Sequence, residues 1–333
     1  MRRYPLKLIL AALVLLLLVI GEAHYLYARA EPSPPTRLQS KYFAKEKAEW
    51  GGKIDALGAK GAYAEFLRAY ADLPLGSAHS LAHIFGELLY EKEGLSGVAV
   101  CDNSFGFGCY HSFFGRAISE HGVEVVRELD RACIAVWGEK GLGCQHGIGH
   151  GVLWYLGDEH LVDALSLCAS LTWKGPIGGC SSGVFMEYNF RTMADPDGAS
   201  VRPYEASLAH MPCSAISVYG EACYFEMPHW WIRIFEGSVP HVGALCREVS
   251  VAKEKEACFK GIGNILAAKM SYDVEETRRG CGSLGSQEEK TLCSTGASWS
   301  FMGEPRVRDK APELCEGLPA AERSFCLEGS DII

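Results

Sequence analysis

The fourteen cysteines of this 333-residue chain fall into seven consecutive pairs, and their spacing constrains the fold more than any other feature. In residue number, the two cysteines of a pair differ by between 8 and 12, and the first members of successive pairs differ by 32, 35, 45, 33, 35 and 34. The pairs are Cys101 with Cys109, Cys133 with Cys144, Cys168 with Cys180, Cys213 with Cys223, Cys246 with Cys258, Cys281 with Cys293, and Cys315 with Cys326. Thiolate metal sites are the alternative, but the C-x2-C spacing typical of them is absent. We therefore predict one disulfide within each pair, formed in an oxidising compartment.

A period of roughly 34 residues is typical of helix–turn–helix repeats, which bury their apolar faces by stacking on their neighbours. The runs Val123–Ala132 and Leu161–Leu167 precede first cysteines and carry apolar residues at three- and four-residue steps, as amphipathic helices do. Turn-forming residues such as Lys174–Gly179 lie between the cysteines. Each disulfide should therefore join the end of one helix to the start of the next, with a stabilisation of about 3 kcal/mol.

A glycine stands three residues after the second cysteine in five of the units. These glycines are Gly147, Gly183, Gly261, Gly296 and Gly329. Because glycine inside a helix costs about 1 kcal/mol relative to alanine, its recurrence predicts helices that approach one another closely.

The period and the cysteine placement resemble TPR and Sel1-like solenoids, and most of all the cysteine-rich Sel1-like proteins with one disulfide per helical hairpin. The resemblance covers about residues 61–333 and implies architecture but no function, because the leucine-glycine and tyrosine signature of Sel1 repeats is not present. It implies an all-α, right-handed αα-hairpin repeat array of about eight units. Seven units would carry disulfides, and an eighth, around Ser77, would lack one.

The N-terminus predicts export from the cytoplasm. Basic residues precede an uninterrupted apolar run, Leu8–Ile20, which fits either a signal peptide cleaved after Ala30 or an uncleaved membrane anchor that extends through Tyr27. Residues 1–30 are thus the targeting segment, 31–60 a linker with the first helix, and 61–333 the repeat domain. In both cases we expect this domain in the periplasm or at the cell surface, with the membrane as a partner if the segment is retained.

Composition excludes some functions. Hydrophobic residues make up 48% and charged residues 22% of the chain, as in ordinary globular proteins. A net charge of −9 argues against nucleic acid as a partner, because phosphate binding requires a basic surface. The chain also lacks a G-x-S-x-G nucleophile motif, a phosphate-binding glycine loop and a C-x-x-C-H haem motif.

Histidines recur two and six residues after the second cysteine, at what we call positions 2 and 6 of a unit. These two positions share one helix face because they are four residues apart. With Ser77 taking the place of the cysteine in the first unit, the histidines in this register are His79, His83, His111, His146, His150 and His229. Gly115 stands at position 6 in the unit of His111, where it leaves room beside the rings.

Such a concentration of imidazoles predicts a site for zinc, iron or copper. His79, His83, His111, His146 and His150 would be ligands, and the two i,i+4 pairs would hold two metals or one metal with a supporting cluster. His229 is a weaker candidate because Pro228 disturbs its helix. Glu87 continues the first helix face as a ligand or orienting group, and Glu187 is a second candidate acid or base.

The leading hypothesis is thus an extracytoplasmic metal-dependent enzyme, hydrolytic or oxidative; a zincin peptidase is excluded because H-E-x-x-H is absent. The alternative for the histidines is hydrogen bonding within a tightly packed helix stack. The alternative for the protein is a non-enzymatic scaffold that binds a peptide, glycan or protein ligand in its groove. The insertion Arg191–Pro203 breaks the period and would form a rim of the binding face or a neutral surface loop.

Overall fold

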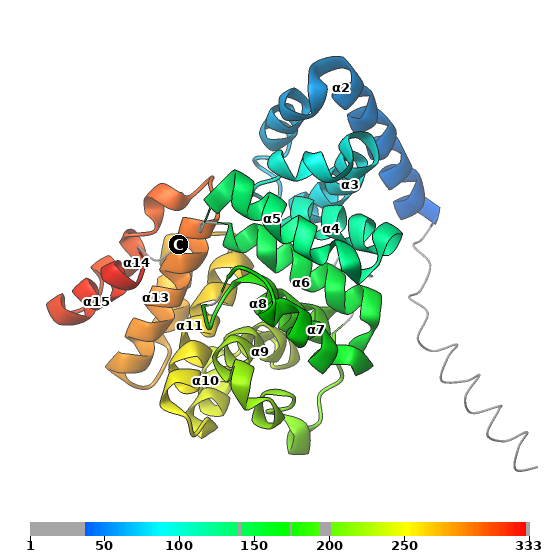
Figure 1. Cartoon of the computed structure of the whole chain (residues 1–333). Helices are drawn as coiled ribbons and strands as arrows, with labels where there is room; N and C mark the ends of the chain where they lie inside the picture. The colour runs from blue at the N-terminus through cyan, green and yellow to red at the C-terminus, as the bar shows by residue number, and fades with distance from the viewer. Residues whose placement is uncertain (1–36, 139–140, 174, 194–200, 331–333) are drawn as a thin grey trace, which may run out of the picture. The chain divides into compact units, whose positions relative to one another are not determined.

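The computed structural model describes residues 37–138, 141–173, 175–193 and 201–330, which form helices and loops without strands (Figure 1). The chain divides into two compact units, Met1–Tyr42 and Phe43–Ile333. Of the first unit only residues 37–42 are described, and they begin helix α2 (Arg37–Ala69). The predicted signal peptide or anchor at residues 1–30 lies outside the described residues. Within the described ranges, the helices are too short or too polar to span a membrane.

All seven predicted disulfides are present, with Cα–Cα distances from 5.4 to 5.8 Å. The bonds join Cys101 to Cys109, Cys133 to Cys144, Cys168 to Cys180, Cys213 to Cys223, Cys246 to Cys258, Cys281 to Cys293, and Cys315 to Cys326. Every cysteine therefore has the partner predicted for it, and none is free to ligate a metal.

Five of the disulfides join consecutive α-helices, as predicted. These helix pairs are α5 (Val126–Trp137) with α6 (Leu142–Leu156), α7 (Leu161–Ala169) with α8 (Gly179–Phe190), α10 (Val239–Glu248) with α11 (Ala252–Lys269), α12 (Val274–Gly282) with α13 (Gln287–Gly303), and α14 (Glu313–Glu316) with α15 (Ala320–Ser330). The prediction of an all-α fold with disulfides between neighbouring helices is confirmed.

In the other two units a 3-10 helix stands where the period predicts the first α-helix. Gly94–Ala99 precedes the disulfide that leads into α4 (Gly108–His121), and Cys213–Ala215 precedes α9 (Gly220–Ile234). The first segment contains two glycines, which disfavour a regular helix. The second follows Pro212, which has no N–H to donate to a preceding turn.

Helix α3 and the helices that contain the second cysteines pack on one another in chain order and form what we call the stacked row. The row consists of α3 (Leu75–Glu93), α4, α6, α8, α9, α11, α13 and α15 (Figure 1). A Cβ added to Gly183 would lie 2.0 Å from the carbonyl oxygen of His146, and one added to Gly261 would lie 2.1 Å from that of Phe225. Gly183, Gly261 and Gly296 therefore let neighbouring backbones touch, as predicted, whereas Gly147 and Gly329 face side chains of the neighbouring helix.

Helix α3 has its own partner without a disulfide. The α2 rings of Trp50 and Phe66 pack against Phe85 of α3, with ring centroids 6.2 and 4.9 Å from it. All three rings are fully buried, and each contributes roughly 1.5–3 kcal/mol by leaving water. Aromatic packing thus holds the unit that we predicted around Ser77. Helix α2 is kinked at Gly58, and the predicted domain boundary at residue 61 stays a prediction.

The stacked row bends so that the end of α13 meets the segments on either side of α3. The backbone N–H of Phe105, just before α4, donates to Oε2 of Glu304 at the end of α13, 3.0 Å away. The guanidinium of Arg306 lies over the ring of Phe105 and donates to the carbonyl of Ala71. The described residues from 43 onward therefore curve round a shared inner side instead of forming an open arc.

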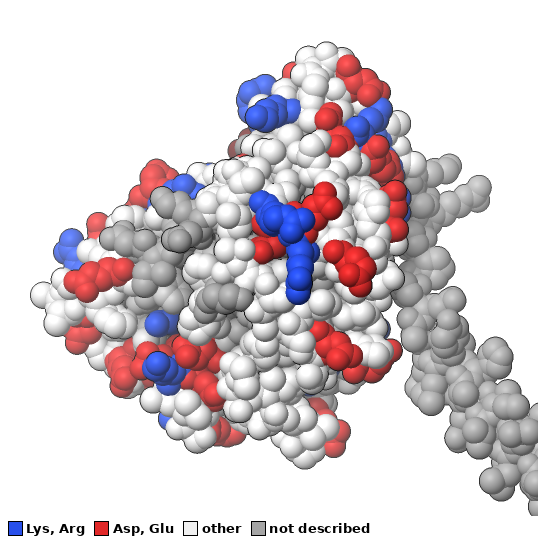
Figure 2. All heavy atoms as spheres, in the orientation of Figure 1, with Lys and Arg blue, Asp and Glu red and all other residues white. Residues whose placement is uncertain are grey.

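Charged side chains of both signs are scattered over the face drawn in Figure 2. Among the described residues on this face, the basic side chains lie next to acidic ones and form no continuous stripe. The expectation that nucleic acid is not a partner stays a prediction.

Candidate metal centre

The five histidines predicted as ligands come together where α3, α4 and α6 stack. Helix α3 presents His79 and His83, α4 presents His111, and α6 presents His146 and His150. Each i,i+4 pair shares a face of its helix, and stacking in chain order places the three faces side by side. His79, His83 and His111 form one group of three, and His111, His146 and His150 form a second. Within each group the ligand atoms lie within 4.8 Å of one another.

The first group is held by contacts at the outer nitrogens of its rings. Nδ1 of His79 lies 2.8 Å from the carbonyl oxygen of Phe105, and Nδ1 of His83 lies 2.8 Å from the hydroxyl of Ser112. Because a carbonyl oxygen only accepts, Nδ1 of His79 must carry its proton, and Nε2 of this ring then presents a lone pair. That Nε2 lies 3.1 Å from Nε2 of His83. In His79 and His83, one ring nitrogen is thus anchored while the other faces the neighbouring histidine.

The second group repeats this arrangement with a carboxylate. Nδ1 of His150 lies 2.8 Å from Oε2 of Glu187 on α8, and Nε2 of His150 lies 3.0 Å from Nε2 of His146. The hydroxyl of Thr192 and the backbone N–H of Met193 donate to the same carboxylate, at 2.6 and 3.2 Å. A carboxylate that orients a ligating imidazole is a recurring partner of metal-binding histidines.

His111 belongs to both groups. Its Nδ1 lies 3.3 Å from Nε2 of His83, and its ring centroid lies 4.2 Å from that of His150. Its Nε2 is buried and has no hydrogen-bond partner. A buried polar atom without a partner costs about 1–3 kcal/mol, so packing alone leaves this ring incompletely satisfied.

Burial keeps the imidazoles neutral, which is the form that binds metals. Burial lowers the pKa of His79 and lowers that of His146 to about 4. Burial together with the neighbouring imidazoles lowers the pKa of His83, His111 and His150 well below the ordinary value of 6.5. Burial also raises the pKa of Glu187 to about 8, although its hydrogen bonds from Thr192 and Met193 act in the opposite direction.

The two predicted carboxylates lie in different places. Glu87 is about one-third exposed and lies 3.2 Å from Lys47 and 3.7 Å from Arg116, in a surface ion-pair cluster. Glu187 is 2% exposed and contacts His150. The structure therefore brings Glu187, and not Glu87, to the histidines.

His229 lies in neither group of three. It is on α9 beside Glu226, with 3.8 Å between its Nε2 and Oε2 of the glutamate, and both atoms are buried without a hydrogen-bond partner. Burial, with a smaller contribution from His146, lowers the pKa of His229 to about 3. Burial raises the pKa of Glu226 to about 8. The sequence register thus places His229 on the same inner side but not in the same cluster.

Sequence reasoning missed the partners supplied by loops. Phe105 contributes a backbone oxygen, which no side-chain pattern reveals, and Thr192 and Met193 lie at the start of the insertion. The space beside Gly115 is filled, because a Cβ on this glycine would lie 2.2 Å from the Met193 methyl carbon. The broken period at Arg191–Pro203 was the one available signal, and residues 194–200 of this insertion lie outside the described residues.

Comparison with family models, curated proteins and solved structures gives no match to this chain. The structure shows an all-α chain with seven disulfides between neighbouring helices, and both the relation to TPR and Sel1-like solenoids and the handedness of the array stay predictions.

Proposed function

We propose that this protein holds a transition metal between α3, α4 and α6, outside the cytoplasm, and uses it as a metal-dependent enzyme. Seven disulfides support the oxidising compartment. Five neutral imidazoles in two overlapping groups support the metal. Zinc, iron and copper all accept such ligands.

The state of His111 carries the proposal. In a purely structural network, His83 would donate to His79 and His146 would donate to His150. Those hydrogen bonds would account for the separations of 3.1 and 3.0 Å between their Nε2 atoms. Nε2 of His111 would still be buried without a partner. A metal bound to Nε2 of His111, or two metals that share its ring, would give this nitrogen the partner that it lacks.

The distances between the nitrogens also fit a metal. Ligands at the usual zinc–nitrogen length of about 2.0–2.1 Å stand roughly 3.3 Å apart around a tetrahedral ion. Two nitrogen pairs of the first group are 3.1 and 3.3 Å apart, one pair of the second group is 3.0 Å apart, and all ligand atoms of a group lie within 4.8 Å of one another. Three histidine ligands leave a position for water, which a zinc or iron ion would activate for hydrolysis, or for oxygen in an oxidative reaction.

Metal analysis of the full-length protein tests the proposal. The protein should be produced with its disulfides formed and without a histidine tag, then supplemented separately with zinc, iron and copper. We expect near-stoichiometric metal, one or two ions per chain. A His146→Ala/His150→Ala variant with the wild-type circular dichroism spectrum should lose the ion held by the second group. His160→Ala is the control, because His160 is exposed and pairs with Asp163. A folded protein that takes up none of the three metals would refute the proposal.

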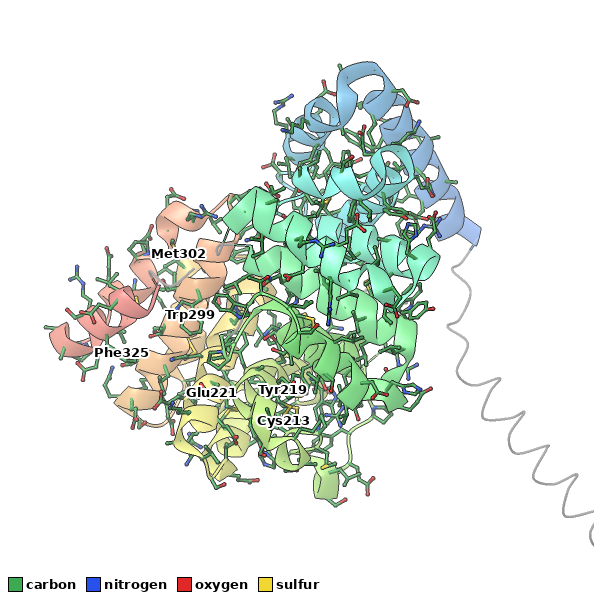
Figure 3. All side chains as sticks on the ribbon, viewed as in Figure 1. Cys213, Tyr219, Glu221, Trp299, Met302 and Phe325 are labelled. Atoms are coloured by element: carbon green, nitrogen blue, oxygen red, sulfur yellow. A yellow bond between two sulfur atoms is a disulfide. The ribbon has the colours of Figure 1, made fainter. Side chains whose placement is uncertain are left out.

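A second candidate function, a binding scaffold, rests on a different feature. A cavity of about 530 Å³ lies among α7, α8, α9 and the start of α11, and none of the five histidines lines it. Trp173, Tyr219, Glu221 and Lys253 contribute aromatic and charged groups to its wall, and Figure 3 shows Tyr219 and Glu221 near Cys213. This chemistry suits a peptide or a glycan. Binding to peptide or glycan arrays that is lost in Tyr219→Ala would support this function, and equal binding by the variant would exclude this cavity.

A further inference from the structure

The five histidines occupy five of six equivalent places in the candidate metal centre. Positions 2 and 6 of the units on α3 and α6 each carry a histidine, which gives His79 with His83 and His146 with His150. Helix α4 lies between them and carries His111 at position 2 but Gly115 at position 6. One side chain is therefore missing from a regular array of three helices and two positions.

Met193 fills that place from another part of the chain. An ideal Cβ on Gly115 would lie 2.2 Å from the methyl carbon of Met193 and 4.0 Å from its sulfur. The second distance is comparable with the separation between the Cβ of a histidine and its far ring nitrogen. The thioether sulfur thus stands about as far from the α4 backbone as the ligand nitrogen of a histidine at position 115 would.

Met193 is also anchored to the groups that hold the histidines. Its backbone N–H donates to the carboxylate of Glu187, 3.2 Å away, and this carboxylate lies 2.8 Å from Nδ1 of His150. The hydroxyl of the preceding residue, Thr192, contacts both the Glu187 carboxyl group and Nδ1 of His150. These contacts tie the backbone of Met193 to the carboxyl group that holds the second histidine group.

We infer that Met193 supplies a thioether ligand to the histidine centre and that the resident metal is copper. This inference rests on the proposed metal centre and deepens it. Zinc sites in proteins are built from cysteine, histidine and carboxylate ligands. Thioether sulfur is a soft ligand that selects Cu(I), and mixed histidine and methionine ligation is typical of copper sites. Gly115 then has a specific role, because a side chain at that position would displace the thioether.

X-ray absorption at the copper edge tests the inference on full-length protein loaded anaerobically with a Cu(I)–acetonitrile complex and no reductant. All fourteen cysteines are in disulfides, so a Cu–S shell would identify a methionine. We expect a Cu–S shell in the wild type and its loss in Met193→Leu, which conserves volume. In competition with a Cu(I) chelator, Met193→Leu should bind about tenfold or more weakly, an effect at least as large as loss of a ligand's hydrogen-bond partner. Its affinity for Zn(II) should be unchanged.

Two further variants separate ligation from packing. Gly115→Ala should push the flexible end of Met193 aside without unfolding the protein and should remove the same Cu–S shell. Met302→Leu, on α13 and packed against a separate apolar cluster, should leave the shell intact (Figure 3). Copper bound by nitrogen alone, with equal Cu(I) affinity in the wild type and Met193→Leu, would overturn the inference and leave the metal centre. Failure to bind any metal would overturn both.

Discussion

Oε2 of Glu187 lies 2.8 Å from Nδ1 of His150, although 37 residues separate them along the chain. The contact crosses from α8 to α6 and fixes which nitrogen of His150 faces the other histidines. The same carboxyl oxygen accepts hydrogen bonds from the hydroxyl of Thr192 and from the backbone N–H of Met193. Glu187 thus links the helical part of the candidate site to the insertion.

Replacing Glu187 by Gln should weaken metal binding by about 10- to 100-fold, as removal of such partners usually does. The melting temperature of the metal-free protein should change little, because burial raises the pKa of Glu187 to about 8 and the group is already neutral at pH 7. Glu226→Gln is the matched control, since this glutamate is equally buried and also has a pKa of about 8. Equal loss of metal affinity in both variants would contradict a specific role for Glu187.

Gly183→Ala should destabilise the protein by about 1–3 kcal/mol, the usual cost of adding atoms to a core that is already tightly packed. The added methyl group would lie 2.0 Å from the carbonyl oxygen of His146 and 3.1 Å from the amide nitrogen of His150, and backbone atoms cannot rotate away. Gly52→Ala serves as the control: it lies within α2 with open space around it, and should stabilise by about 0.5–1 kcal/mol. Denaturant titration measures both, and two changes of the same sign would refute the close-packing argument.

The metal-free protein should be most stable between about pH 6.5 and 7. The pKa values of His79, His83, His111, His146, His150 and His229 are all lowered in the folded state. Below the unfolded value of about 6.5, the unfolded chain therefore binds protons that the folded chain does not, so stability falls as the pH drops.

Two carboxyl groups act in the opposite direction at higher pH. Glu187 and Glu226 keep their protons up to a pKa of about 8 when folded but lose them from about 4.5 when unfolded, so their contribution falls as the pH rises between these values. Below pH 6.5 the contribution of the six histidines outweighs that of the two glutamates. Above this value the histidine contribution fades while that of Glu187 and Glu226 continues to fall. Melting temperatures from pH 4 to 9 check this, and Glu187→Gln/Glu226→Gln should remove the decline above pH 7. A wild-type curve that rises steadily to pH 8 would show that these two carboxyl groups are not buried as described.

Glu304→Ala should destabilise the protein and also weaken metal binding. The substitution leaves the buried N–H of Phe105 and the guanidinium of Arg306 without their partner, and an unsatisfied buried group costs about 1–3 kcal/mol. The carbonyl of Phe105 would then hold His79 less firmly. Glu288→Ala, at an exposed position on the same helix, should change neither property. Calorimetric unfolding and metal titration measure the two effects, and loss of stability with unchanged affinity would uncouple the closing contact from the site.

The sequence by itself determined the disulfide pairing, the close helix contacts and the histidine cluster. Cysteines with a sequence separation between 8 and 12 meet whenever the chain makes one turn between helices, so their pairing does not depend on the rest of the fold. Histidines four residues apart share a helix face for equally local reasons. Repetition of the unit then places corresponding faces next to one another, which brings His111 between the two pairs.

Only the tertiary structure decided the contacts that depend on curvature and on loops. Glu87 and Glu187 were both candidates from the sequence, and the direction of each neighbouring helix decided that Glu187 meets His150 while Glu87 meets Lys47 and Arg116. The contact between Phe105 and Glu304 depends on small rotations added over all the intervening units, which a local pattern does not encode. Met193 reaches the space beside Gly115 through an insertion with no period at all. Local spacing therefore fixed which groups face inward, and the path of the whole chain fixed which of them touch.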